Sequence, residues 1–125
     1  MEPKIMTTRI LVVDDQRTTR EVVRDVLELS GCDVREAETC DEALRLLDED
    51  EAVDAVVADI LLGGRSGIAL IGEIRERHLG LTVVAMSGHG QEVLDAARAA
   101  GADACLPKPF SARDLMAALA GGAPS

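Results

Sequence analysis

Short apolar runs alternate along this chain with segments whose apolar residues recur at helical spacing, and this alternation constrains the fold more than any other feature. The runs cover residues 10–13, 33–37, 55–58, 82–86 and 103–106. After each run, apolar side chains return every three or four residues, as they do along one face of a helix. Strands that alternate with helices are typical of a parallel sheet. We therefore predict an α/β fold, with a doubly wound sheet and helices on both faces.

The polarity of the runs predicts the order of the strands. The first, third and fourth runs are almost continuously apolar, as expected of central strands that are buried on both faces. The second run alternates between polar and apolar residues, and the fifth meets Pro107, so these two suit the edges. We predict one domain with a five-stranded parallel sheet in the order 2-1-3-4-5. Its core spans about residues 9–120, and residues 121–125 form a flexible tail or the start of a linker.

Local signals mark the ends of several helices and loops. Ser111 is expected to cap the last helix at its N-terminus. Gly101 is expected to end the fourth helix. The glycine-rich segment 62–67 is expected to be a loop. The acidic run 48–51 lies at the unfavourable pole of the second helix dipole, so we expect it to be solvated and frayed.

Composition excludes several classes of function. The net charge is −10, which is the wrong sign for sequence-independent binding to nucleic acid, and Phe110 is the only aromatic residue. Cys32, Cys40 and Cys105 are scattered without metal-ligand spacing or an even count, which favours a reducing compartment. The first residues lack the apolar centre of a signal peptide, and no segment is long enough to span a membrane. We expect a soluble cytoplasmic protein with no direct contact to nucleic acid and no membrane insertion.

Polar residues follow four of the predicted strands, at the edge where open α/β sheets bind ligands. Asp14 and Asp15 follow the first strand and Asp59 ends the third, while Ser87 and Lys108 follow the fourth and fifth. Three neighbouring carboxylates repel one another unless a cation lies among them. Carboxylate oxygens favour Mg²⁺, with Mn²⁺ as a possible substitute. A carboxylate nucleophile beside a metal, a lysine and a hydroxyl suits an aspartyl-phosphate.

Each of these signals is weak alone. An Asp-Asp pair before a helix is more often an N-cap and turn, and a Ser-Gly or Lys-Pro pair after a strand is more often a simple turn or loop. The functional interpretation depends on all of them lying on one edge of one sheet.

Four segments in this order resemble the signature of the response-regulator receiver domain, the CheY-like domain of two-component signalling. They are "ILVVDD", "VVADILLGGRSG", "VVAMSGHG" and "ACLPKPF", and the resemblance extends over about residues 9–119. It implies that Asp59 takes a phosphoryl group from a sensor histidine kinase or a histidine phosphotransfer protein. It also implies that Mg²⁺ is held by Asp14, Asp15, Asp59 and the backbone carbonyl of Leu61.

The resemblance assigns signalling roles as well. Ser87 is similar to the switch hydroxyl that bonds a phosphoryl oxygen, and Lys108 to the lysine that pairs with the site, with a cis bond between Lys108 and Pro109. A downstream protein or output domain is expected to bind the face formed by the fourth helix, the fifth strand and the fifth helix. Such a domain assists its own phosphorylation and dephosphorylation but turns over no metabolite, so it is a signalling receiver and not a metabolic enzyme.

Three residues bear on how the switch is tuned. Cys105 stands where the family most often has tyrosine or phenylalanine, and a cysteine cannot reproduce the inward rotation of that ring. We expect Cys105 to be a small side chain without a switch role, or else a redox-sensitive thiol. His89 is either an exposed loop histidine or a group that tunes hydrolysis of the aspartyl-phosphate. Leu61 could tune the same reaction by steric cover.

Three other functions share part of this pattern. A flavodoxin-like electron carrier needs a Ser/Thr-rich phosphate loop and aromatic rings around the flavin, whereas this chain has "DDQRTT" and one phenylalanine. A haloacid-dehalogenase-like phosphatase needs an Asp-x-Asp pair and a cap insertion, whereas here the aspartates are adjacent and the chain has 125 residues. A purely structural pseudo-receiver would lack a site residue, and none is missing.

Overall fold

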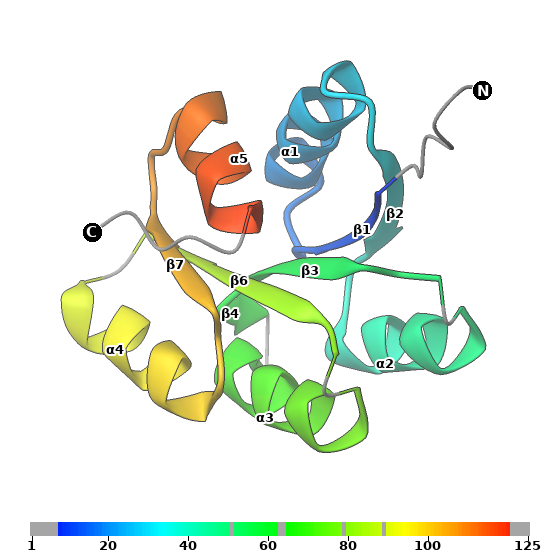
Figure 1. Cartoon of the computed structure of the whole chain (residues 1–125). Coiled ribbons are helices and arrows are strands. Elements are labelled where there is room, and N and C mark those ends of the chain that lie inside the picture. The colour runs from blue at the N-terminus through cyan, green and yellow to red at the C-terminus, as the bar shows by residue number, and fades with distance from the viewer. Residues whose placement is uncertain (1–7, 51, 63–64, 79, 89, 121–125) are drawn as a thin grey trace.

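The sheet has the strand order that the sequence predicts. The computed structural model describes residues 8–50, 52–62, 65–78, 80–88 and 90–120. Within them, five parallel strands pair in the order β2-β1-β3-β6-β7 (Figure 1). In chain order, they are β1 (Arg9–Val13), β2 (Asp33–Ala37), β3 (Ala55–Asp59), β6 (Thr82–Ser87) and β7 (Ala104–Pro107). The continuously apolar strands β3 and β6 are fully or almost fully buried, whereas the alternating strand β2 is at an edge.

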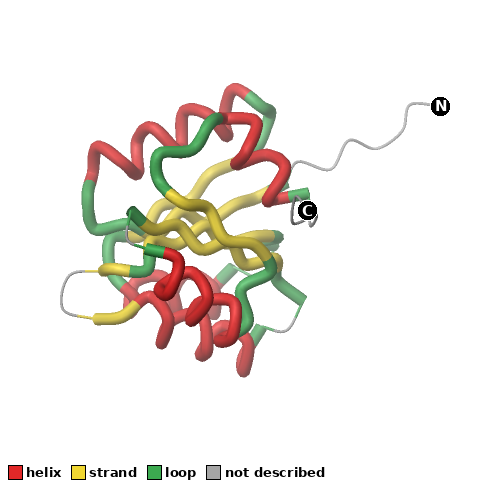
Figure 2. Tube along the Cα trace, turned by 90° about the vertical axis from the view of Figure 1, so that its left-hand side faces the viewer, coloured by secondary structure: helices red, strands yellow, loops and turns green. Residues whose placement is uncertain are grey.

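Five helices cover the two faces of this sheet, so the chain forms three layers (Figures 1 and 2). Helices α1 and α5 pack on one face, and α2, α3 and α4 pack on the other. They span α1 (Arg17–Leu29), α2 (Cys40–Glu49), α3 (Gly67–Arg77), α4 (Gln91–Ala100) and α5 (Ala112–Leu119). None of the helices over the described ranges combines the length and the apolarity that a membrane crossing requires.

Alternation along the strands divides the core between the two faces. In β1, Leu11 and Val13 pack with helices α2, α3 and α4, whereas Ile10 and Val12 pack with α1 and α5. This follows because successive side chains of a strand point to opposite faces of the sheet. Both layers are closely packed, with side chains such as Ile71 completely buried. The sheet is therefore a rigid support for the residues that follow its strands.

The segment after β3 is more regular than the sequence analysis predicted. In place of a plain loop, it contains a small antiparallel ribbon of β4 (Leu61–Leu62) and β5 (Arg65–Ser66). Strands of two residues carry no detectable alternation, and glycine is depleted in strands, so the sequence could not indicate them. Ser66 then caps α3, because its hydroxyl accepts a hydrogen bond of 3.1 Å from the backbone N–H of Ile68.

The predicted helix ends are confirmed. As expected, the acidic run is solvated at Asp48 and Glu49, where α2 ends, and its fraying stays a prediction. Ser111 and Asp114 form a reciprocal capping box at the start of α5, and Gly101 ends α4 at a φ of 123°. Asp48, however, is paired with Arg77 and lies 3.1 Å from Nε2 of His78. Asp50 is paired with Arg9 at 2.9 Å. The cations come from α3 and β1, far away in sequence, and Glu51 lies outside the described residues.

Candidate functional site

Two buried aspartates lie side by side at the carboxyl edge of the sheet. The register of β1 and β3 pairs Val13 with Ala58, so the next residues, Asp14 and Asp59, occupy adjoining strand ends. The side chain of Asp14 is 0% exposed and that of Asp59 is 13% exposed. Burial of two acids at one point is costly unless a cation or hydrogen bonds compensate their charge.

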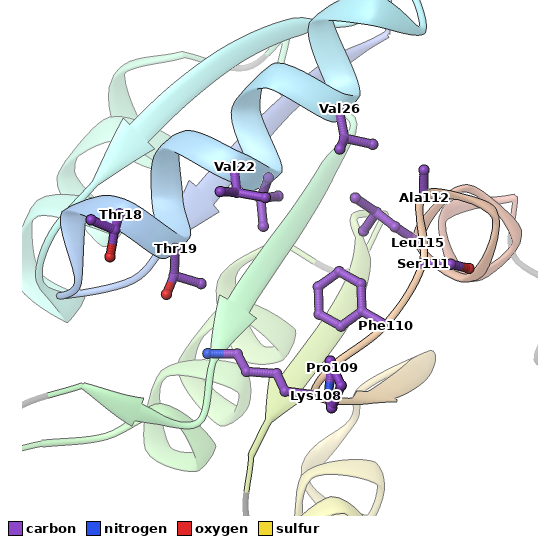
Figure 3. A pocket seen from close by; sticks show the side chains of 11 residues that line it. Thr18, Thr19, Val22, Val26, Lys108, Pro109, Phe110, Ser111, Ala112 and Leu115 are labelled. Carbon is purple, nitrogen blue, oxygen red and sulfur yellow. The ribbon is translucent and has the colours of Figure 1, made fainter.

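Lys108 provides the compensating charge. It follows β7, and its backbone N–H donates a 2.8 Å hydrogen bond to the carbonyl of Ser87 at the end of β6. The Lys108–Pro109 peptide bond is cis, as the resemblance implies. The Nζ atom lies 2.6 Å from Oδ2 of Asp59 and 3.5 Å from Oδ2 of Asp14. In Figure 3, the side chain extends from the segment before α5 toward the end of β3.

Asp14 is the least satisfied group of the site. Its Oδ1 accepts a 2.9 Å hydrogen bond from the backbone N–H of Gln16. Its Oδ2 is buried without a hydrogen bond. Burial raises the pKa of Asp14 above its ordinary value, and the charges of Asp59 and Asp15 add to this, while the Gln16 N–H and Lys108 oppose it. A buried carboxylate oxygen with unused lone pairs beside further acids is a suitable ligand for a hard divalent cation.

The predicted set of three carboxylates is only partly assembled. Asp15 is exposed, next to the buried pair. Across the described part of the chain, no three acidic, histidine or cysteine side chains lie close enough together to form a ready metal site. The structure therefore brings Asp14 and Asp59 together around Lys108, with Asp15 at the rim. The donor set of oxygens fits Mg²⁺, and the exposed position of Asp15 leaves room for water ligands, which Mg²⁺ retains.

Ser87 and Leu61 frame this site on either side of Asp59. Ser87 ends the neighbouring strand β6 and is 1% exposed. The backbone N–H of Leu61 donates a 2.9 Å hydrogen bond to Oδ1 of Asp59, so each carboxylate oxygen of Asp59 has a donor. Leu61 is half exposed, and its covering role stays a prediction.

The two remaining predicted residues lie apart from this cluster or cannot be described. Cys105 is half-buried on β7, and its thiol donates to the carbonyl of Leu94 in α4 at 3.4 Å. Burial raises the pKa of the Cys105 thiol. A higher pKa leaves less thiolate, which disfavours the redox interpretation. His89 lies outside the described residues.

Sequence reasoning missed two residues that shape the site. A Cβ atom on Gly67 would lie 2.7 Å from the Cα of Ile60 and still closer to the carbonyl oxygen of Asp59, so only glycine fits there. Arg20 donates from Nη1 to the backbone carbonyl of Asp14 at 2.8 Å. A glycine directly after a Ser N-cap was a usable signal, because glycine is a poor helix former. Nothing in the sequence distinguished Arg20 from the other surface arginines of the same helix.

The fold and the site together define a doubly wound α/β domain with two buried acids and a lysine paired with them at its carboxyl edge. Residues 10–120 match the family described as the response regulator receiver domain. The chain belongs to this family.

Known relatives agree with this assignment. The transcriptional regulatory protein CpxR of Escherichia coli (strain K12) is 34% identical over 111 residues, which are 87% of this chain and 46% of CpxR. A response regulator receiver domain protein from Clostridium thermocellum has a TM-score of 0.85 at 31% identity and covers 90% of this chain and 91% of that chain. A response regulator from Burkholderia pseudomallei, solved with a phosphorylated aspartic acid, a calcium ion and citrate, has a TM-score of 0.83 at 29% identity and covers 90% of this chain and 66% of that chain. The chain spans about half the length of the curated relatives it matches.

Proposed function

We propose that Asp59 is the phosphoacceptor of this receiver domain and that a phosphohistidine of a sensor kinase or phosphotransfer protein is the donor. In this reaction, a carboxylate oxygen of Asp59 forms the new O–P bond. The P–N bond of the donor breaks, and its electron pair stays on the imidazole. The observation that carries the proposal is the contact of 2.6 Å between Lys108 Nζ and Asp59 Oδ2, at the end of the sheet where Asp14 and Asp59 are both buried.

Mg²⁺ would be held by Asp14, Asp15, Asp59 and the backbone carbonyl of Leu61. When bound, it neutralises charge on the phosphoryl oxygens. The support is the buried Oδ2 of Asp14, which has no hydrogen bond, together with the raised pKa of that acid. Without phosphate, the affinity is expected to be weak, because Mg²⁺ gives up its water reluctantly and Lys108 already compensates part of the charge. The calcium ion in the Burkholderia pseudomallei structure agrees with a preference for hard cations.

Ser87 and Lys108 would convert phosphorylation into a change of partner binding. Lys108 would exchange its bond to Asp59 for one to a phosphoryl oxygen, and the Ser87 hydroxyl would move to bond another. Because Lys108 N–H is tied to the Ser87 carbonyl, the ends of β6 and β7 would respond together. The neighbouring face of α4, β7 and α5 is therefore the proposed surface for a downstream protein or output domain. This role places the chain in a cytoplasmic phosphorelay, as a signalling receiver that assists its own phosphorylation and dephosphorylation.

Phosphorylation by a small acyl-phosphate donor tests this proposal. The purified chain is incubated with the donor and Mg²⁺, and intact mass spectrometry is expected to show one added phosphoryl group. Asp59→Asn is expected to abolish the addition. Asp95→Asn removes an exposed acid on α4 and is expected to leave it unchanged. Persistent labelling of the Asp59 variant, or equal labelling with and without EDTA, would contradict the proposal.

A further inference from the structure

Arg20 links the backbone of Asp14 to the edge strand β2, and it makes no hydrogen bond to the carboxylates of Asp14, Asp15 or Asp59. Its Nη1 donates to the backbone carbonyl of Asp14 at 2.8 Å, and its Nε donates to Oε1 of Glu36 at 3.0 Å. Glu36 belongs to β2, where it pairs with Val12 of β1. The Arg20 side chain is 13% exposed and that of Glu36 is 29% exposed, so the pair is mostly shielded from solvent.

These contacts fix the peptide that joins the two acids. The N–H of Asp14 donates to the carbonyl of Ala37 at 3.1 Å, and its carbonyl accepts from Arg20. The Asp14–Asp15 peptide is planar, so fixing the carbonyl of Asp14 also fixes the N–H and Cα of Asp15. Asp15 is exposed, and the described structure gives its side chain no hydrogen bond that could orient it independently. The direction in which Asp15 leaves the backbone therefore depends on Arg20.

We propose that Arg20 is a positioning residue for the cation site. It holds the Asp14–Asp15 peptide in the orientation from which both carboxylates can face one cation. The planar guanidinium group suits this task, because its fixed fork of N–H donors reaches a carbonyl and a carboxylate at once, which a single ammonium group does not do equally well. Mutation of a group that hydrogen-bonds to a metal ligand, without touching the metal, commonly lowers metal affinity by roughly 10–100-fold. The inference rests on the proposed metal site but not on phosphorylation itself.

Arg24 provides a matched control on the same helix. It lies one turn further along α1 and donates to the other oxygen of Glu36 at 3.1 Å. It also contacts Asp25 but makes no hydrogen bond to Asp14. Arg20 and Arg24 thus share the anchor and differ in the contact to the acidic pair. If the arginine–glutamate cluster has only a structural role, substitution of either arginine should change metal affinity to a similar extent. The positioning role predicts that only substitution of Arg20 lowers metal affinity.

The test is direct metal binding by the whole chain, with free Mn²⁺ measured by electron paramagnetic resonance and Mg²⁺ by competition. Arg20→Met is expected to weaken binding about tenfold. Arg20→Lys, which keeps the charge and a single donor group, is expected to restore part of the affinity. Arg24→Met is expected to stay within about twofold of the wild type. With an acyl-phosphate donor, Arg20→Met is expected to raise the Mg²⁺ concentration for half-maximal phosphorylation while the rate at saturating Mg²⁺ stays near that of the wild type.

Three results would overturn the inference. They are unchanged Mn²⁺ affinity in Arg20→Met, an equal loss in Arg24→Met, and a wild-type chain that binds no Mn²⁺. If Arg20→Met does not fold, Arg20→Lys and Arg20→Gln decide the question by the same criteria. A wild-type chain that binds Mn²⁺ but takes no phosphoryl group would count against the proposed function alone, because the metal titration needs no phosphodonor.

Discussion

The amino and carboxyl edges of the sheet, where its parallel strands begin and end, differ in how well their charges are compensated. At the amino edge, charges are matched: Arg9 pairs with Asp33 at 2.7 Å and with Asp50 at 2.9 Å. There, Arg75 pairs with Asp103 and donates to the carbonyls of Gly101 and Leu81 at 2.6 Å each. At the carboxyl edge, two buried acids share one lysine, and one oxygen has no hydrogen bond. The ion pairs at the amino edge stabilise the fold. The carboxyl edge keeps negative charge that is only partly compensated and that a bound cation can neutralise.

The pKa values of one aspartate on each edge express the same contrast. The pKa of Asp50 is lowered, first by the backbone N–H of Ala52 and then by Arg9. The pKa of Asp14 is raised, mainly by burial. The charge of Asp50 thus favours the folded state, and the charge of Asp14 opposes it. Natural proteins commonly keep such unfavourable groups where function requires them.

Gly67→Ala is expected to have the largest effect, because it tests how closely the carboxyl edge is packed. The added methyl group would meet the backbone of Asp59 and Ile60, which cannot move aside as a flexible side chain would. Overpacking of this kind costs about 1–3 kcal/mol, sometimes more. Chemical denaturation of the metal-free chain measures the loss.

Gly72→Ala is the control on the same helix. A Cβ atom there has no neighbour within 4 Å, so the substitution is expected to stabilise α3 by up to about 1 kcal/mol through helix propensity. Equal effects at the two glycines would refute the close contact between α3 and the end of β3.

Asp14→Asn is expected to have the next largest effect and to separate stability from function. It removes a buried charge, and burial is the main reason why the pKa of this acid is raised. We therefore expect a metal-free chain that is more stable than the wild type and that no longer binds Mg²⁺. Asp15→Asn changes an exposed acid, so it is expected to lose metal binding without a gain in stability. Thermal unfolding with and without Mg²⁺ checks both, and a less stable Asp14 variant would contradict the electrostatic argument.

The pH dependence of unfolding sharpens the comparison further. Asp14 has a raised pKa in the folded state, so its cost is full above that pKa and disappears as the pH falls toward the ordinary value of 3.8. Asp50 has a lowered pKa, so its contribution is full above 3.8 and is lost only below it, as the pH falls through the lowered folded value. Relative to wild type, Asp14→Asn is therefore expected to lose its advantage as the pH falls toward 3.8. Asp50→Asn is expected to be less stable than the wild type at neutral pH. If Asp14→Asn is more stable than the wild type by the same amount at every pH, an interaction other than the charge of Asp14 causes the difference.

The sequence was enough to predict the strands and the residues at their ends, but not the contacts between residues that are far apart in sequence. The strand order followed from polarity, because a central strand must be apolar on both faces and an edge strand need not be. The strand-end residues Asp14, Asp59 and Lys108 could be foreseen, since parallel strands bring their carboxyl ends together. The ion pair of Asp48 with Arg77 could not, because its partners are far apart in sequence and surface charges carry no periodic signal. Gly67 and Arg20 were missed for a related reason. Both matter because they contact backbone groups of the site, and the position of those groups cannot be read from the sequence.

Cys105→Ala is expected to have the smallest effect and asks whether β7 carries a switch of its own. An aromatic ring at this position would bury about 150–250 Å² and would favour one of two states strongly. The thiol of Cys105 is small and already bonded to the carbonyl of Leu94 at 3.4 Å, so the protein gains little from moving it. We expect the variant to change phosphorylation-dependent partner affinity by less than about tenfold, or about 1.4 kcal/mol. Ser87→Ala is expected to remove most of that dependence while Asp59 still accepts the phosphoryl group. Titration of a partner against phosphorylated and unphosphorylated chains measures both, and a Cys105 variant that loses the response while the Ser87 variant keeps it would place the switch in β7.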